Sequence, residues 1–187
     1  MANRDNPIGF RPAQGIGSQH VLKYFPVDVA NGTALFVGDV VDLDPNGGVI
    51  PAAADAGVSA AGVCVGVYDT NGVPCGSPNS AVSTKYLTVS TRGYALVALA
   101  IPGAVFVTQA SDGSISENDI GATADHVAGT GDTTTARSRH VLNSSTGGLQ
   151  FRILGHVDEP NNAYGADVDL YVVFNESAFG ASAAASV

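Results

Sequence analysis

Basic residues are scarce in this chain: lysine occurs only twice and arginine six times among 187 residues, and the net charge is −9. Proteins that bind nucleic acid through its phosphates need clustered lysine and arginine. The eight basic residues here are scattered, so direct binding of DNA or RNA is not expected. Charged residues of both signs make up only 13 % of the chain, about half the usual share of roughly 25 %. This low charge indicates a surface that partner molecules partly cover.

Cysteine is also rare, since Cys64 and Cys75 are the only two. A chain of this length needs no disulfide framework, and none is implied. No apolar run approaches the roughly 18 residues of a membrane helix, so no membrane association is expected. The first residues lack the apolar centre of a signal peptide, and we expect synthesis in a cytoplasm.

Short β-strands separated by turns dominate the rest of the chain. Runs rich in valine and aromatic residues are bounded by turn sequences such as Asn31-Gly32 and Pro45-Asn46-Gly47-Gly48. The expected strands lie at 20–29, 33–37, 40–44, 49–50, 61–68, 86–89, 93–99, 104–109, 138–142, 149–157 and 167–174. No window of a helix's length has a helical apolar stripe. The pattern predicts an all-β fold, a short-stranded β-barrel or sandwich, with less than about a fifth of the residues in helices.

The chain divides by composition into five segments. Residues 1–19 contain two prolines and three glycines and are expected to form an extended N-terminal arm. Residues 20–110 are expected to form a β-barrel module, and residues 138–176 a closing β layer of the same domain. The Gly-, Asp- and Thr-rich stretch 111–137 is interpreted as a surface excursion between them. The Ala- and Ser-rich residues 177–187 are interpreted as a flexible tail.

Motifs with catalytic or metal-binding spacing are missing from the sequence. The segment from Asp42 to Gly47 resembles the start of a calcium loop, but Ala53 occupies the position of the bidentate glutamate, so we expect a hairpin turn there. Four histidines lack the spacing of a zinc site: His20, His126, His140 and His156. There is no phosphate loop and no nucleophile elbow. We therefore expect no metal, no cofactor and no enzymatic activity.

The N-terminal arm carries the candidate binding residues. Three basic residues and one acidic residue lie within the first 23 positions, whereas the rest of the chain is acidic. Ile8 and Phe10 are exposed apolar residues if nothing covers them, and Arg4 and Arg11 can pair with carboxylates. The arm is interpreted either as a docking segment that grips a partner through these four residues or as a frayed terminus. On the first interpretation, removal of residues 2–13 leaves the body folded and weakens binding to the partner.

Three stretches of the chain resemble one protein family. The first is residues 1–12 (MANRDNPIGFRP); the second comprises 37–41 (VGDVV), 47–49 (GGV) and 61–67 (AGVCVGV); the third comprises 151–155 (FRILG), 161–166 (NNAYGA) and 170–176 (LYVVFNE). In this order they resemble the capsid cement or decoration proteins of tailed phages, in particular small virion proteins of marine and cyanobacterial phages. The resemblance covers roughly half of the chain and contains no catalytic signature.

The resemblance implies a structural virion protein on the capsid exterior, made in the host cytoplasm, that binds the major capsid protein and stabilises the shell against internal pressure. It also implies a homotrimer, and the low charge together with many apolar strands favours self-association. Two alternatives stay open. One is another virion part, such as a tail or fibre-associated β module, although fibres usually contain repeats and none is found here. The other is a β-barrel enzyme whose site is dispersed over several strands.

Overall fold

The computed structural model describes residues 3–14, 18–28, 32–53, 60–111, 113, 115–143 and 150–179. Among these residues the only helical element is a single 3-10 turn, η1 (Glu117–Asp119). Helix accounts for 2 % of the structure and strand for 40 %. The prediction of an all-β chain with little helix is therefore confirmed.

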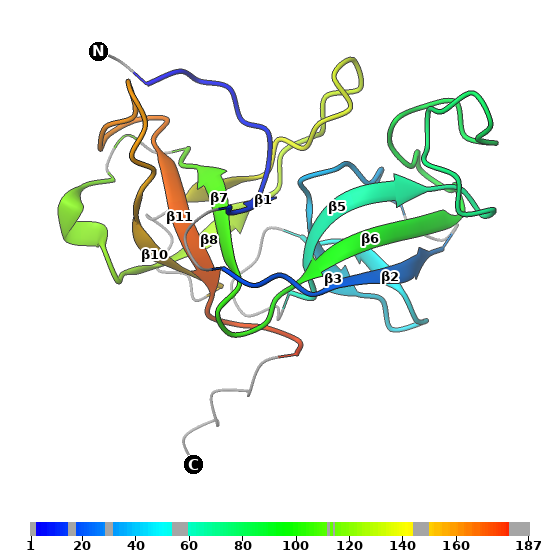
Figure 1. Cartoon of the computed structure of the whole chain (residues 1–187), viewed down its shortest axis with the longest axis horizontal. Coiled ribbons are helices and arrows are strands. Elements are labelled where there is room, and N and C mark those ends of the chain that lie inside the picture. The colour runs from blue at the N-terminus through cyan, green and yellow to red at the C-terminus, as the bar shows by residue number, and fades with distance from the viewer. Residues whose placement is uncertain are drawn as a thin grey trace.

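The strands form two antiparallel sheets, which lie next to each other in Figure 1. In spatial order, the six-stranded sheet contains β1 (Arg11–Pro12), β7 (Val105–Gln109), β11 (Asp169–Phe174), β10 (Phe151–His156), β8 (Thr123–Val127) and β9 (Val141–Asn143). The five-stranded sheet contains β2 (Leu22–Val27), β6 (Gly93–Leu99), β5 (Gly62–Tyr68), β3 (Val40–Leu43) and β4 (Val49–Pro51). Neither sheet closes into a barrel, so of the two expected architectures the sandwich fits.

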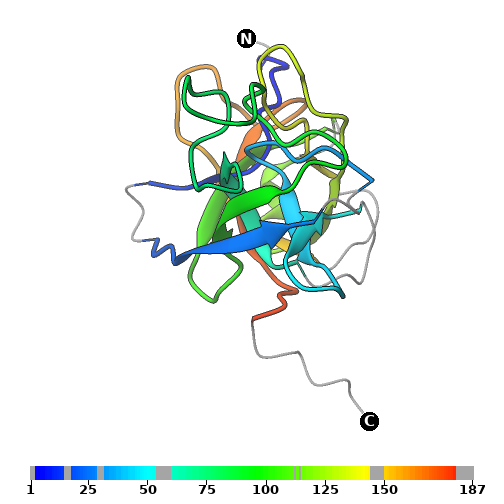
Figure 2. The same ribbon diagram turned by 90° about the vertical axis from the view of Figure 1, so that its right-hand side faces the viewer.

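The apolar side chains are buried in two main clusters. One lies at the junction of the sheets, where Phe106, Phe151 and Leu170 of the six-stranded sheet pack with Val63 and Ala98 of the five-stranded sheet. The other lies on the opposite face of the five-stranded sheet. There the connections between strands supply the cover: Leu35 and Leu87 are both fully buried and form a β-bridge with each other. The connection 69–92 rises above this sheet in Figures 1 and 2.

The expected hairpin turn after Asp42 is confirmed, because β3 and β4 pair across it. The Oδ1 atom of Asp44 accepts a hydrogen bond from the backbone of Asn46 at 2.8 Å, and the carbonyl of Asp44 accepts one from Gly47 at 2.9 Å. Gly48 has a φ of +102° and lies against β2, so that a Cβ atom on it would stand 2.2 Å from the carbonyl oxygen of Pro26. This turn therefore brings β4 and β2, the two edges of the five-stranded sheet, close together.

The strands are shared between the sheets differently from the expected segments at two places. The stretch 111–137 is not simply a surface excursion, because β8 runs through it as an internal strand of the six-stranded sheet. Its buried residues include Asp125 and His126, and these polar residues hide the apolar alternation that marks a strand. In addition, β7 belongs to the six-stranded sheet and not to the first module of residues 20–110. Residues 180–187 of the expected tail lie outside the described residues.

The approach of β4 to β2 gives a matched pair of substitutions. Gly47 and Gly48 both have positive φ, but a Cβ atom on Gly47 would meet nothing within 4 Å. Gly47→Ala should cost about 1–2 kcal/mol of unfolding free energy from backbone strain alone. Gly48→Ala should cost about 1–3 kcal/mol more, because the methyl group collides with a strand backbone. Urea unfolding of both variants measures the difference, and equal losses would contradict the close approach.

Candidate binding surfaces

Phe10, expected to be an exposed anchor, lies in the junction between the sheets. Its side chain is only 1 % exposed and stacks on Phe151, with ring centroids 4.8 Å apart. Its backbone N–H donates to the carbonyl of Gly38 at 2.8 Å, next to the start of β3. The expectation of an exposed Phe10 is therefore wrong, since burial among the two sheets provides the cover that the sequence could not reveal.

Glycine allows the arm to pass this point. Gly9 has a φ of +76°, and a Cβ atom on it would stand 2.5 Å from both the Gly38 carbonyl oxygen and the Cβ atom of Ser138. Beyond this crossing, Arg11 and Pro12 form β1, which pairs with Val107 and Phe106 of β7. Residues 3–14 of the arm are therefore bound to both sheets, and the interpretation as a frayed terminus does not hold for them.

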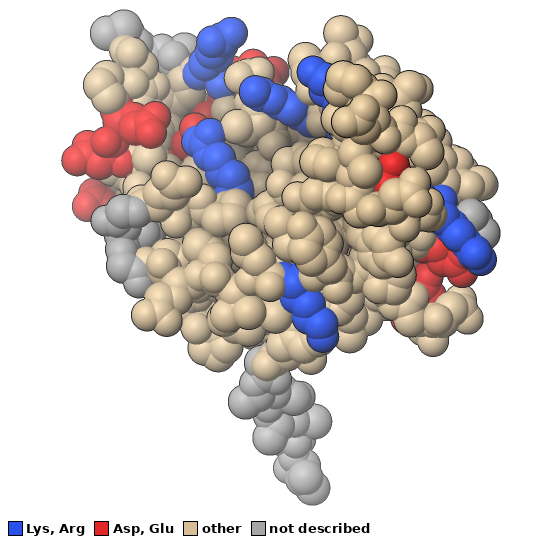
Figure 3. All heavy atoms as spheres, turned by 45° about the vertical axis from the view of Figure 1, so that its right-hand side comes forward, with Lys and Arg blue, Asp and Glu red and all other residues tan. Residues whose placement is uncertain are grey.

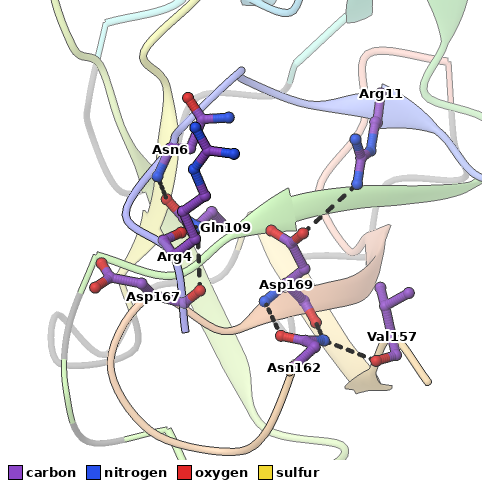
Figure 4. Close-up of polar contacts among 8 residues, drawn as sticks. All are labelled: Arg4, Asn6, Arg11, Gln109, Val157, Asn162, Asp167 and Asp169. Carbon is purple, nitrogen blue, oxygen red and sulfur yellow. Dashed lines mark hydrogen bonds and ion pairs between the residues drawn. The ribbon is translucent and has the colours of Figure 1, made fainter. Parts of the chain in front are cut away.

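Gln109, at the end of β7, holds the first part of the arm (Figure 4). Its Nε2 atom donates to the carbonyls of Arg4 at 2.8 Å and Asp167 at 3.1 Å, and its Oε1 atom accepts the backbone N–H of Asn6 at 3.1 Å. Asn3 adds bonds from its side chain to the carbonyls of Ala163 and Ala166, both 2.7 Å long. The buried side chain of Gln109 thus forms the hydrogen bonds that a neighbouring strand would otherwise provide to the backbone of the arm.

The two arginines of the arm differ in their surroundings. The side chain of Arg4 is exposed, whereas Arg11 lies 3.6 Å from Asp169 of β11 (Figure 4). Burial raises the pKa of Asp169, and the charge of Arg11 partly counters that rise. Ile8 is half-buried. Of the four residues expected to contact a partner, the structure leaves Arg4 fully available, Ile8 and Arg11 in part, and Phe10 not at all.

The sequence interpretation missed an uncharged surface on the five-stranded sheet. Strands β2, β5 and β6 contain a single charged residue, Lys23. Lys23 points to the same side of β2 as Phe25 and Val27, so the other side carries no charge. We define this side as the tyrosine face; it consists of Leu22, Tyr24, Pro26, Gly66, Tyr68, Tyr94 and Leu96. In the view of Figure 3 acidic side chains gather mainly toward the two sides of the molecule, and the surface between them is mostly neutral with separate Lys and Arg side chains.

The aromatic side chains of the tyrosine face are held in place by each other. Leu22 and Tyr24 are 52 % and 55 % exposed, and Tyr94 is 39 % exposed. The rings of Tyr24 and Tyr68 meet edge to face with centroids 5.2 Å apart, and a hydrogen bond with Tyr24 together with burial raises the pKa of Tyr68. Tyr68 lies over Gly66, where a Cβ atom would stand 3.1 Å from the ring. The signal in the sequence is that both sides of these strands carry apolar residues, whereas only one side of each is needed for the core.

A groove borders the tyrosine face on the side of the six-stranded sheet. It has a volume of about 650 Å³ and is lined by Leu22 and Val65 on one wall and by Arg11, Val107 and Tyr171 on the other. Arg11, Pro12, Ala13 and Gln14 of the arm all line the groove, so this part of the arm forms one rim of it. The tyrosine face and the arm are thus parts of one continuous surface.

Within the described residues, no group of three or more His, Cys, Asp or Glu side chains could hold a metal ion. The two cysteines are free thiols, and burial raises the pKa of Cys64 and also that of Cys75, to about 11. Thiols with raised pKa values are poor nucleophiles.

Two buried histidines, His126 and His140, lie together at the junction of the sheets. Neither of them lines the groove beside the tyrosine face.

Comparison with known proteins identifies no relative: no family model matches the chain, and neither the curated proteins nor the solved structures give a match. The described residues include no helix long and apolar enough to cross a membrane. The function must therefore be inferred from the surfaces of the molecule.

The position of Phe10 changes what truncation of the arm is expected to do. Phe10→Ala should lower the free energy of unfolding by about 3–5 kcal/mol, because it leaves a cavity in the main core. Val21→Ala, at a site 50 % exposed, should change it by less than about 0.5 kcal/mol. Removal of residues 2–13 should destabilise the body in the same way as Phe10→Ala. Chemical denaturation decides the matter: a Phe10→Ala chain as stable as Val21→Ala would show that the arm is dispensable for folding.

Proposed function

We propose that this chain is a structural virion protein that binds the outer surface of a tailed-phage capsid and stabilises the shell. The resemblance of its opening, middle and closing stretches to capsid cement proteins suggests the family of functions. The tyrosine face is the observation that carries the proposal, because it offers a broad uncharged contact surface on an otherwise acidic molecule. The major capsid protein is the proposed partner.

The charge distribution favours the tyrosine face over the rest of the surface. A chain with a net charge of −9 repels other acidic surfaces, and this repulsion is weakest where its own surface has no acidic side chains. Burial of a fully exposed apolar side chain is worth about 1.5–3 kcal/mol of binding free energy. Leu22 and Tyr24 are 52 % and 55 % exposed in the free protein, so burial of each is worth correspondingly less. Modest affinity at each of many sites is sufficient, because a protein that binds only the assembled shell stabilises it by mass action.

The arm has a different part in this proposal from the one expected. Its apolar residue Phe10 contributes to the core, and Arg11 contributes to the rim of the contact surface, whereas Arg4 and Ile8 do not line the groove beside the tyrosine face. Charged groups at a rim mainly guide association and make it sensitive to salt. Self-association into a trimer is also proposed, on the basis of the resemblance and the low charge.

Variants of the tyrosine face test the proposal. Leu22→Ser combined with Tyr24→Ser should reduce occupancy on particles stripped of the native protein at least tenfold, because it removes the largest exposed apolar side chains of the face. Ile120→Ser combined with Val89→Ser is the matched control, since both residues are similarly exposed, 48 % and 51 %, and lie outside the face. Circular dichroism confirms that both variants fold.

Occupancy is measured by quantitative mass spectrometry of washed particles. Full occupancy by the Leu22→Ser, Tyr24→Ser chain would exclude the tyrosine face as the contact surface. Binding of the wild-type chain to isolated tails and not to filled heads would instead favour the alternative of a tail-associated module.

A further inference from the structure

Two buried histidines join the six-stranded sheet to the five-stranded sheet. His126 lies in β8, and His140 immediately precedes β9; they are 1 % and 3 % exposed. Their rings stack with centroids 5.2 Å apart and an interplanar angle of 25°. Neither residue belongs to the surface through which we propose that the protein binds a capsid.

Each imidazole reaches a backbone group of the other sheet. The Nδ1 atom of His140 accepts a hydrogen bond from the backbone N–H of Val40, the first residue of β3, at 3.3 Å. The Nε2 atom of His126 lies 3.4 Å from the carbonyl of Ala52, which follows β4. The Nδ1 atom of His126 is held at 2.7 Å by Gln150. His140 therefore adds a side-chain link across the junction to the backbone hydrogen bonds from Phe10 to Gly38 and from Ser138 to Val37. A neutral His126 carries one ring proton and donates either to Gln150 or to Ala52.

The bond from Val40 determines which proton His140 carries. Because Nδ1 accepts a hydrogen bond, the proton of the neutral ring must be on Nε2. That atom faces Oδ1 of Asp39 at 3.5 Å, while Oδ2 of Asp39 accepts the backbone N–H of Phe36 at 2.8 Å. A second proton can be added to His140 only at Nδ1, where the N–H of Val40 already points.

We propose that His140 is an acid-sensitive latch between the two sheets: uptake of a second proton at Nδ1 breaks the hydrogen bond from Val40 and opens the junction locally at β3 and β9. The added proton creates two N–H donors facing each other in a buried site, and it places a cation beside the stacked ring of His126. Opening lets water reach the imidazolium and removes both penalties.

The titratable groups around the latch change the stability of the fold with pH in opposite directions. Burial, together with His126, lowers the pKa of His140 to about 3, and burial lowers the pKa of His126. Burial raises the pKa of Asp39 to about 7. The charge of Asp125, the neighbour of His126 in β8, favours the charged form of His126. Asp42, on the same side of β3 as Val40, is also buried, and burial raises its pKa to about 6, so it acts in the same direction as Asp39.

The sign of each contribution follows from linkage. A neutral buried histidine stabilises the closed state above its unfolded pKa of about 6.5, and this contribution is lost as the pH falls toward the folded value. Asp39 contributes in the opposite sense: its contribution is complete below the unfolded value of 3.8 and is lost as the pH rises through 7. The pH dependence of the wild-type chain is therefore a sum, and variants are needed to separate its parts.

His140→Asn tests the latch, because the Oδ1 atom of asparagine can accept the bond from Val40 but cannot take up a proton. Urea unfolding of the full chain is measured between pH 7 and pH 4.5. Below pH 6 the unfolding constant of the wild type should rise relative to that of His140→Asn by about tenfold per pH unit, the slope of one proton. His156→Asn, a half-buried histidine outside the junction, should follow the wild type. Parallel curves for the wild type and His140→Asn would overturn the proposal.

Two further measurements test the latch without the His140→Asn variant, in case that variant does not fold. Asp39→Asn should make the chain more sensitive to acid than the wild type between pH 6 and pH 4.5, by up to tenfold per pH unit, because it removes the opposing group. Hydrogen exchange of the wild-type Val40 amide, corrected for the intrinsic effect of pH, should accelerate as the pH falls from 6 to 5. Corrected exchange that does not change with pH would contradict a latch at this bond.

Discussion

The stacking of Phe10 on Phe151 at the junction of the two sheets is the contact on which the rest of the molecule depends. It places the start of the chain between a sheet formed mainly by its first half and a sheet formed mainly by its second half. The arm can pass there only because Gly9 and Gly38 approach without side chains. Once the arm is seated, β1 can pair with β7 and Gln109 can bind the backbone of the first residues. The arm is in this sense a structural link between the sheets as much as a surface feature.

The sequence predicts the strands better than it predicts their partners. The strands expected at 61–68 and 93–99 are found at nearly the same positions, because valine-rich runs between turns have few other structures available. The position of Phe10 could not be predicted, since its stacking partner lies far along the chain and no local pattern identifies it. Strand β8 was missed because it buries His126, a polar residue that is tolerated only through bonds formed by the completed fold. The tyrosine face was missed because alternation does not reveal which apolar side of a strand is left uncovered.

The distribution of charge connects the fold with the proposed function. Acidic residues keep most of the surface repulsive toward other acidic molecules, while the tyrosine face remains apolar and rigid through the contact of Tyr24 with Tyr68. A preorganised aromatic surface loses little conformational entropy on binding. The buried histidines lie at the junction, so the five-stranded sheet that presents the tyrosine face is joined to the six-stranded sheet by the proposed latch at His140.

The central claim is that the chain binds a shell through the tyrosine face while its arm stays between the two sheets. An electron cryo-microscopy reconstruction of capsids carrying the protein tests this most directly. The account predicts that Tyr24 and Leu22 face the shell and that Phe10 remains stacked on Phe151. A reconstruction in which the arm has left the junction and entered the shell, with the tyrosine face exposed to solvent, would contradict it.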